Sequence, residues 1–382
     1  MEPTEAESME VLRQRTSEKW ALFDAEHLPM FVAEMDFPLA PPIRQALHAA
    51  IDRGDTGYLN PRDPGVAAAF AAFAADRWGW RPPVSGMATT TDVSVVVVES
   101  LRRLVRPGEG VVVMPPVYPP FFDFVTEAGG TVVEVPLADD GVGWAIDLDG
   151  VDAALAAGAR GVLLCSPHNP LGLVHPRAQL RALSEIVERH GGFVVSDEIH
   201  APLTHTDAVF TPYLSVSDAA REHGIAAHSA SKAFNLAGLK CALFVTAGER
   251  MTALVRGLPE EIVFRTGLFG AMASRVGFAE GRDWLDGTIA ALEGNRRLLT
   301  QLLTERMPAV GYREPRASYL AWLDFRALDW GDDPARIARR RGKVVLSNGP
   351  RFGAPGRGFA RLNLACSPEL LAEAVDRLVR AA

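Results

Sequence analysis

The sequence predicts an α/β fold: a mainly parallel sheet covered by helices on both faces, followed by a smaller α+β domain. The first observation is that short apolar stretches, often β-branched, alternate with segments of helical periodicity up to about residue 275. The second is that a long helical stretch replaces this alternation afterwards. The third is size, because 382 residues, 48% of them hydrophobic, are enough for two domains with large cores.

The predicted strands are short and apolar, which is typical of strands covered on both faces. A helix is predicted in Pro176–His190, where apolar residues recur three or four positions apart between Leu180 and Val187. The predicted strands before and after this helix are Val111–Met114, Thr131–Val135, Gly161–Cys165 and Phe193–Ser196.

The chain is expected to divide into three parts. Residues 51–275 contain the alternating pattern and are predicted to form the large domain. Residues 276–382 are predicted to form the small domain, because a helical stretch at Asp283–Met307 precedes a strand-like segment at Ser318–Phe325 and a helical C-terminus. Residues 1–50 are expected to pack with the small domain.

Charge and composition argue against several classes of protein. The formal charge of -8 disfavours a nucleic-acid or anionic-membrane partner, since either would require a basic face. The apolar run Val93–Val98 is far too short to cross a membrane. The nine histidines show no metal-ligand spacing, so no metal site is expected.

The cytoplasm is the expected compartment. The first residues, Met1 to Glu10, are acidic and polar, which is not the composition of a signal peptide. Cys165, Cys241 and Cys366 stand singly in apolar surroundings. They are predicted to be buried small residues in a reducing environment.

Polar residues follow several predicted strands, where ligands bind in an open parallel sheet. Each group alone has an ordinary explanation as a turn, a helix cap or a surface residue. Their occurrence together, in this order and at this spacing, predicts a shared site. The groups are Pro115–Tyr118, Ser166–Pro170, Ser196–His200 and Ser229–Lys232.

These residue types match what pyridoxal 5′-phosphate (PLP) requires: an amine, a phosphate cradle and a partner for the ring nitrogen. Lys232 is predicted to supply the amine, because a partly desolvated ammonium loses its proton readily and can attack an aldehyde. Asp197 is predicted to keep the ring nitrogen protonated, since a nearby opposite charge favours the charged form. The other predicted contacts are Asn169 with the ring oxygen, Tyr118 with the ring face and Arg361 with the substrate carboxylate.

Seven segments carry a family resemblance: Pro167–Gly172, Val195–His200, Ser229–Leu239, Arg361–Asn363, Val32–Phe37, Thr56–Tyr58 and Ala317–Trp322. As a set they resemble fold-type I PLP enzymes of the class I/II aminotransferase superfamily. More narrowly, they resemble its cystathionine β-lyase branch, the MalY/PatB-like C–S lyases. The resemblance runs from about residue 30 to the C-terminus, and it implies the PLP fold type I for the large domain.

The resemblance also implies roles for individual residues. Lys232 would carry the cofactor in a Schiff base and move the proton at the substrate Cα. Tyr58 would reach the phosphate of the neighbouring subunit, which makes a homodimer the expected unit. The other implied phosphate ligands are Ser229, Lys240 and the backbone N–H groups around Thr91, Asp92 and Val93.

Two positions depart from the family pattern. Asp92 stands where the phosphate loop usually has a glycine, and a carboxylate there would repel a phosphate. Glu34 stands where the lyase branch generally has aspartate, in a segment that tends to border the substrate. These differences leave the cofactor prediction unchanged and leave the substrate open.

The predicted reaction is β-elimination from a cystathionine-like or S-substituted cysteine, giving a thiol, pyruvate and ammonia. His200, three residues after Asp197, favours the lyase branch, since many aminotransferases have tyrosine at that position. Transamination is the second possibility. A third is a specialised enzyme of secondary metabolism that acts on an unusual amino acid. In each case the partner is a small amino-acid substrate.

Overall fold

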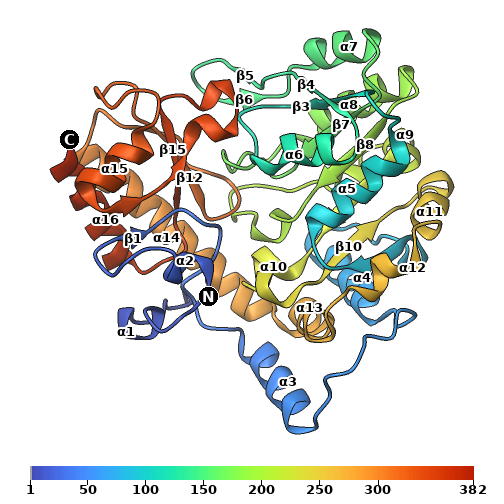
Figure 1. The fold of residues 1–382 in the computed structure, drawn as a ribbon, viewed down its shortest axis with the longest axis horizontal. Helices are drawn as coiled ribbons and strands as arrows, with labels where there is room; N and C mark the ends of the chain where they lie inside the picture. Colours follow the sequence, from blue (N-terminus) through green and yellow to red (C-terminus); the bar gives the residue numbers. More distant parts are fainter. Residues whose placement is uncertain (1) are drawn as a thin grey trace.

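The computed structural model describes residues 2–382, and Met1 of the predicted N-terminal segment lies outside the described residues. A seven-stranded sheet forms the centre of the larger part, in the order β2-β10-β9-β8-β7-β3-β4 (Figure 1). Its strands are β2 (Met87–Thr90), β3 (Gly110–Val113), β4 (Thr131–Glu134), β7 (Gly161–Cys165), β8 (Phe193–Asp197), β9 (Gly224–His228) and β10 (Ala242–Val245).

Strand direction decides where the loops of this sheet meet. The pairs β3–β4, β3–β7, β7–β8 and β8–β9 are parallel. Strand β10 is antiparallel to both β9 and β2, so β2 runs in the same direction as β9. The carboxyl ends of six strands therefore lie at one edge, and the fold class predicted from the sequence is confirmed.

Helices cover both faces of this sheet, because successive strand residues point to opposite sides. Val111 and Val113 of β3 pack in one core with residues of α5 (Val93–Leu104), α6 (Pro120–Glu127), α11 (Glu249–Arg256) and α12 (Glu260–Phe264). Val112 between them packs in the other core. That second core contains residues of α4 (Gly65–Trp78), α7 (Leu148–Ala156), α8 (Arg177–Arg189), α9 (Asp218–His223), α10 (Ala230–Ala233) and α13 (Leu268–Glu280).

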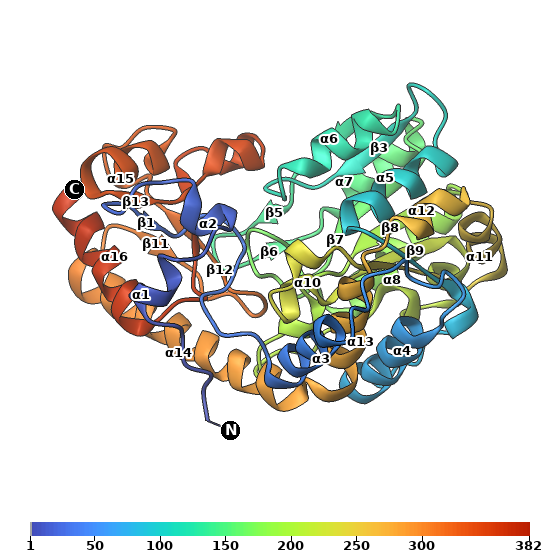
Figure 2. The same ribbon diagram turned by 60° about the horizontal axis from the view of Figure 1, so that its bottom comes forward.

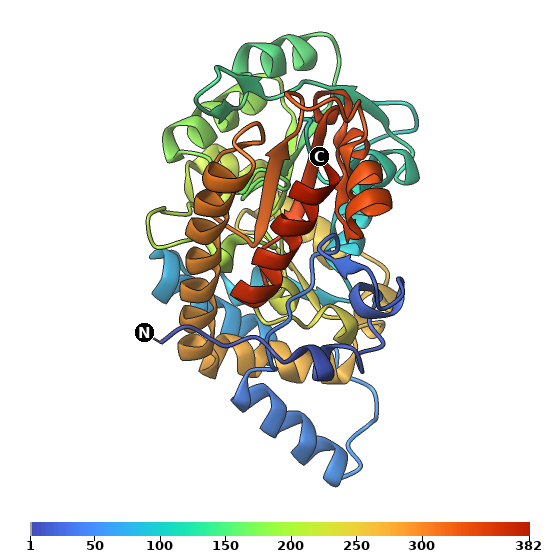
Figure 3. The ribbon, with the colours of Figure 1, turned by 90° about the vertical axis from the view of Figure 1, so that its left-hand side faces the viewer.

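The smaller part is built on a four-stranded antiparallel sheet in the order β11-β12-β15-β14. Helix α14 (Arg282–Arg306) leads into it and packs against α16 (Pro368–Ala381), which follows the last strand (Figure 3). The remaining elements are β11 (Gly311–Tyr312), β12 (Leu320–Asp324), α15 (Pro334–Gly342), β14 (Ser347–Asn348) and β15 (Phe359–Asn363). The predicted helix, strand and C-terminal helix correspond to α14, β12 and α16.

The N-terminal segment is attached to the smaller part. After α1 (Met9–Leu12) and α2 (Glu18–Ala21), strand β1 (Leu28–Pro29) pairs in parallel with β13 (Val344–Val345) (Figure 2). The chain then crosses to α3 (Pro41–Asp52), which packs on α13. The division at residues 50 and 275 stays a prediction, and because α13 spans residue 275 we propose that the small domain begins with α14.

One short strand pair lies outside the two main sheets and the β1–β13 pair. Strands β5 (Ala138–Asp139) and β6 (Trp144–Ala145) form a short antiparallel pair beside the large sheet. Within residues 2–382, none of the helices is both long enough and apolar enough to cross a membrane.

Candidate active site

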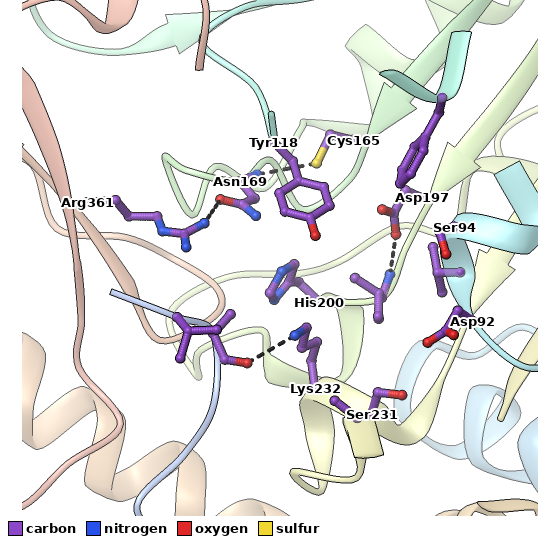
Figure 4. Close-up of a pocket in the computed structure, with 16 residues that line it drawn as sticks. Asp92, Ser94, Tyr118, Cys165, Asn169, Asp197, His200, Ser231, Lys232 and Arg361 are labelled. Carbon is purple, nitrogen blue, oxygen red and sulfur yellow. Dashed lines mark hydrogen bonds between the residues drawn. The ribbon is translucent and has the colours of Figure 1, made fainter. Parts of the chain in front are cut away.

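Eight of the twelve predicted site residues line a cavity at the carboxyl edge of the large sheet (Figure 4), and Tyr58, Thr91, Ser229 and Lys240 do not. Tyr118 follows β3, Asn169 follows β7, Asp197 ends β8 and Lys232 lies on α10, directly after β9. Arg361 reaches the same cavity from β15 of the small domain. The cavity has a volume of about 210 Å³, and side chains from both domains line it.

Lys232 is held as a poorly solvated amine. Burial, assisted by the positive charge of Arg361, lowers the pKa of Lys232 to about 8. Its Nζ atom donates to the carbonyl oxygen of Ala33 at 3.0 Å. A lysine in this state has a substantial neutral fraction near neutral pH, which is the form that attacks a carbonyl carbon.

Asp197 is a buried carboxyl with one hydrogen-bond donor. Its Oδ1 atom accepts from the backbone N–H of Ile199 at 3.1 Å, and the carboxyl group faces the cavity (Figure 4). Burial raises the pKa of Asp197 to about 7, although that single hydrogen bond and the charge of Lys232 oppose the shift. A cationic group bound next to this carboxyl would therefore stabilise its charged form.

This raised pKa predicts a pH-dependent stability for the cofactor-free protein. The pKa of Asp197 is higher in the folded chain than the ordinary 3.8. Its stabilising contribution to the free energy of unfolding is therefore fully present below about pH 4 and is lost as pH rises through about 7. Asp197→Asn keeps an acceptor for Ile199 and carries no charge. We expect it to be more stable than the wild type at pH 8, by on the order of 2 kcal/mol, and equal at pH 4.

Urea unfolding of both cofactor-free proteins at the two pH values measures this difference. Asp123→Asn, an exposed position on α6, is the control and should change nothing. An Asp197→Asn advantage that is the same at pH 4 and pH 8 would contradict the electrostatic explanation.

Arg361 is buried, and hydrogen bonds to three neighbouring residues fix its terminal nitrogens. Nη1 donates to Oδ1 of Asn169 at 2.9 Å, and Nη2 donates to the Phe31 carbonyl at 3.0 Å and to Ser347 Oγ at 3.1 Å. Its Nε–H is buried without a partner in the described residues. Since an unpaired buried donor is costly, this N–H is available to a ligand oxygen. Burial lowers the pKa of Arg361 to about 10, so the group is still a cation.

The segment around Ala33 forms one wall of the cavity and is fixed from two domains. Asn363 of β15 donates through Nδ2 to the carbonyls of Val32 and Glu34, at 2.7 and 2.6 Å. Asn235, after α10, makes two hydrogen bonds with the backbone of Met35. The Ala33 carbonyl, which also accepts from Tyr319 at 2.9 Å, is therefore a fixed acceptor for Lys232.

His200 is a neutral side chain in this site. Burial, together with the charges of Lys232 and Arg361, lowers the pKa of His200 to about 3. Its Nδ1 lies 3.0 Å from Oγ of Ser318, a non-glycine residue at φ 71°. The Ser318 backbone is fixed by hydrogen bonds with Leu203 and His205, which orient the hydroxyl toward His200. The sequence singled out His200 but not its partner Ser318.

The residues predicted to bind the phosphate lie around the start of helix α5 and around α10. Helix α5 begins at Val93, and the backbone N–H groups of Val93 and Ser94 have no helical partner. Asp92 precedes them, but its carboxylate is paired with Lys240, whose Nζ lies 3.2 Å from Oδ2. Lys240 thus neutralises the charge that would otherwise repel an anion. Thr91 is not among the residues that line the cavity.

Ser229 does not turn its hydroxyl to the cavity. Its Oγ donates to the Cys241 carbonyl at 2.6 Å and caps the N–H of Ser231 at 3.0 Å. Ser231 lines the cavity instead, as does Ser94. The phosphate contact of Ser229 stays a prediction. Ser231, whose Oγ lies 2.6 Å from Ser229 Oγ, is a second candidate because it lines the cavity.

The two tyrosines differ in position. Tyr118 borders the cavity, and burial raises its pKa, opposed by the charge of Arg361 (Figure 4). Tyr58 lies in the loop after α3, is not among the residues that line the cavity, and has 92% of its surface exposed. Helix α3 and this loop project from the body of the molecule (Figures 1 and 3).

Comparison with known proteins identifies the family. The profile described as aminotransferase class I and II matches residues 32–378. The chain belongs to this family. The match covers most of the chain and both domains, so the family resemblance predicted from the sequence is confirmed.

Relatives within this family extend over nearly the full length. A Mycobacterium leprae protein provisionally named cystathionine beta-lyase is 41% identical to this chain. The alignment covers 99% of this chain and 98% of the relative. Cystathionine beta-lyase PatB of Bacillus subtilis is 33% identical over 95% of this chain and 94% of its own. The crystal structure of cystalysin from Treponema denticola, which contains PLP, superposes with a TM-score of 0.93 at 25% identity, covering 100% and 98% of the two chains.

Proposed function

We propose that this protein is a PLP-dependent carbon–sulfur β-lyase that cleaves an S-substituted cysteine to a thiol, pyruvate and ammonia. The observation that carries the proposal is the Lys232 amine, with its pKa lowered to about 8, in one cavity with the buried carboxyl of Asp197 and the buried guanidinium of Arg361. The family and the named relatives support the same reaction.

The residues of the cavity fit PLP. Asp197 is a buried carboxyl that forms no ion pair within residues 2–382, which suits pairing with a protonated ring nitrogen. The free N–H groups at the start of α5, with Ser231 nearby, suit a phosphate dianion, which a helix N-terminus favours. Asn169 and Tyr118 lie on the opposite wall and would contact the ring oxygen and the ring face (Figure 4).

When bound, PLP supplies an aldehyde that links to an amine and a ring that withdraws electrons from the substrate Cα. Lys232 is the group that would first hold the cofactor and then take the Cα proton. It is the only lysine in the described chain whose side chain lines the cavity. Arg361 would bind the α-carboxylate through Nε–H and a terminal N–H. Loss of the thiolate from Cβ and addition of one water then account for the thiol, pyruvate and ammonium.

Transamination is the alternative. The full-length relatives that bear the name cystathionine beta-lyase favour elimination over it. His200, whose Nδ1 lies 3.0 Å from Ser318 Oγ, is compatible with either reaction. A specialised secondary-metabolic substrate remains compatible with the same residues.

The reaction is tested with thioether amino acids and no keto acid. We expect S-substituted cysteines to give pyruvate and free thiol over many turnovers, while the cofactor stays in its aldehyde form. A transaminase would instead stall after a single half-reaction as the amine form and resume when a keto acid is added. Stalling across a panel of thioethers, with rescue by pyruvate, would overturn the lyase proposal and keep the PLP assignment.

We further propose that the active unit is a cytoplasmic homodimer. The exposure of Tyr58, in the loop after α3, supports a contact with a second chain. Cys165, Cys241 and Cys366 are buried free thiols, which suits a reducing compartment.

A further inference from the structure

A second carboxyl group, that of Glu198, is buried next to the candidate active site. Glu198 directly follows Asp197 at the end of β8, and its backbone N–H donates to the carbonyl of Ala227 on the neighbouring strand β9. Both carboxyls are buried, but Asp197 lines the cavity and Glu198 does not. The segment Val195–His200 therefore contains two adjacent buried acids, and the proposed reaction uses only one of them.

The two oxygens of Glu198 have different partners. Oε1 accepts from Oγ of Ser196 and from the backbone N–H of Tyr213, both at 2.9 Å. Oε2 lies 3.0 Å from Nε2 of His228. Neither Oε2 nor Nε2 has another polar partner within the described residues, so each of these two atoms depends on the other.

His228 is the basic group that faces Glu198. It is the last residue of β9 and is buried, and its ring packs against Phe70 and Trp78 of α4, with ring centroids 4.5 and 5.7 Å away. These aromatic rings carry no charge. Because an unpaired charge is costly at such a depth, the Glu198–His228 pair is expected to hold one shared proton and to be neutral as a whole.

The charge of this pair acts on Asp197. Burial and, to a smaller extent, the negative charge of Glu198 raise the pKa of Asp197 to about 7, while the charge of Lys232 lowers it. A nearby like charge disfavours ionisation, so neutralising Glu198 makes it easier to ionise Asp197. Asp197 attracts a cationic ring nitrogen only in its ionised form.

We propose that His228 is a positioning residue of the active site, which neutralises Glu198 so that Asp197 is the carboxyl that ionises beside the cofactor. This inference rests on the proposed PLP function and concerns the binding of PLP to the same site. Parallel pairing of β8 with β9 brings the parts together, because His228 ends β9 directly before the segment Ser229–Lys232.

The test compares the PLP dissociation constants of four cofactor-free proteins at pH 8: the wild type, His228→Gln, Glu198→Gln and Glu198→Gln/His228→Gln. His228→Gln keeps an N–H that can donate to Glu198 and loses the basic group. We expect its dissociation constant to rise roughly tenfold, because one unit of pKa is a tenfold change in equilibrium. Glu198→Gln and the double variant have no uncompensated charge and should bind PLP within about threefold of the wild type.

This pattern separates charge from structure. If the pair only held β8 and β9 together, both single variants would bind PLP weakly and the double variant would be no better. A double variant as weak as His228→Gln, or an unchanged dissociation constant in His228→Gln, would overturn the proposal. His190→Gln is the control, since His190 lies 2.7 Å from Asp152 after α8, does not line the cavity, and should bind PLP like the wild type.

Urea unfolding of the cofactor-free proteins at pH 8 tests the link to Asp197 without PLP. We expect His228→Gln to lower the urea midpoint, and to lower it less in an Asp197→Asn background, because the second carboxylate is then absent. An equal shift in the two backgrounds would contradict the coupling. If His228→Gln does not fold, recovery of folding by Glu198→Gln supports the proposal and lack of recovery contradicts it. A wild type that binds no PLP would overturn the proposed function, and the unfolding comparison would still decide the coupling.

Discussion

Lys232→Ala is expected to lose at least about 10³-fold in kcat, because one side chain is proposed both to hold the cofactor and to move the Cα proton. The chain has four lysines, at positions 19, 232, 240 and 343, so the attachment site can be mapped without ambiguity. Borohydride treatment of the wild type should fix the cofactor to the peptide that contains Lys232. Absorbance of the denatured protein and peptide mass mapping measure this directly.

Lys343→Ala is the control for that experiment. Lys343 lies on the surface near Glu26, at 3.7 Å, and its removal should leave both cofactor attachment and turnover intact. Lys240→Ala should weaken cofactor binding by exposing the Asp92 charge, yet keep the covalent link at Lys232. A reduced adduct on Lys240 or Lys343 would show that Lys232 is not the anchor.

Arg361→Ala is expected to lower kcat/KM by roughly 10²-fold, mainly through KM, because a buried charge-assisted contact with the substrate carboxylate disappears. Arg361→Lys should recover little of it. The guanidinium uses two terminal nitrogens for Asn169, Phe31 and Ser347 while leaving Nε–H for the substrate, and a single ammonium cannot serve all of these positions.

Steady-state kinetics with a small neutral thioether checks this effect. Arg357→Ala, which removes an exposed arginine 3.7 Å from Asp332 in the preceding loop, should have kinetics like those of the wild type. Unchanged KM and kcat/KM in Arg361→Ala would remove Arg361 from the substrate site.

The sequence alone determined the fold class and the centre of the site, and the reasons are local. Apolar runs such as Gly161–Cys165 are typical of a sheet covered on both faces, and this strand lies inside the sheet with β8 and β3 beside it. Parallel strands bring their carboxyl ends together, so the polar residues after them, Asn169, Asp197 and Lys232, were expected to meet. They line one cavity.

The tertiary structure decided the contacts made between residues far apart in the chain. The sequence pointed to Ser229 as a phosphate ligand, and only the structure shows that its hydroxyl donates to the Cys241 carbonyl while Ser231 lines the cavity. The fixed Ala33 carbonyl depends on Tyr319, and the partner of His200 is Ser318. No pattern within a strand or helix encodes such pairs, because they form where two domains and the N-terminal segment pack together.

The same distinction separates the reaction from its substrate. The lysine, aspartate and arginine that predict PLP chemistry are recognisable in the sequence by type and spacing. The walls of the cavity are not recognisable in this way. Ala33 lines the cavity because β1 pairs with β13 and because Asn363 donates to the carbonyls on either side of Ala33, which attaches the N-terminal segment to the small domain. Residue chemistry and periodicity thus set the fold and the cofactor, while packing between distant segments sets the space that a substrate can occupy.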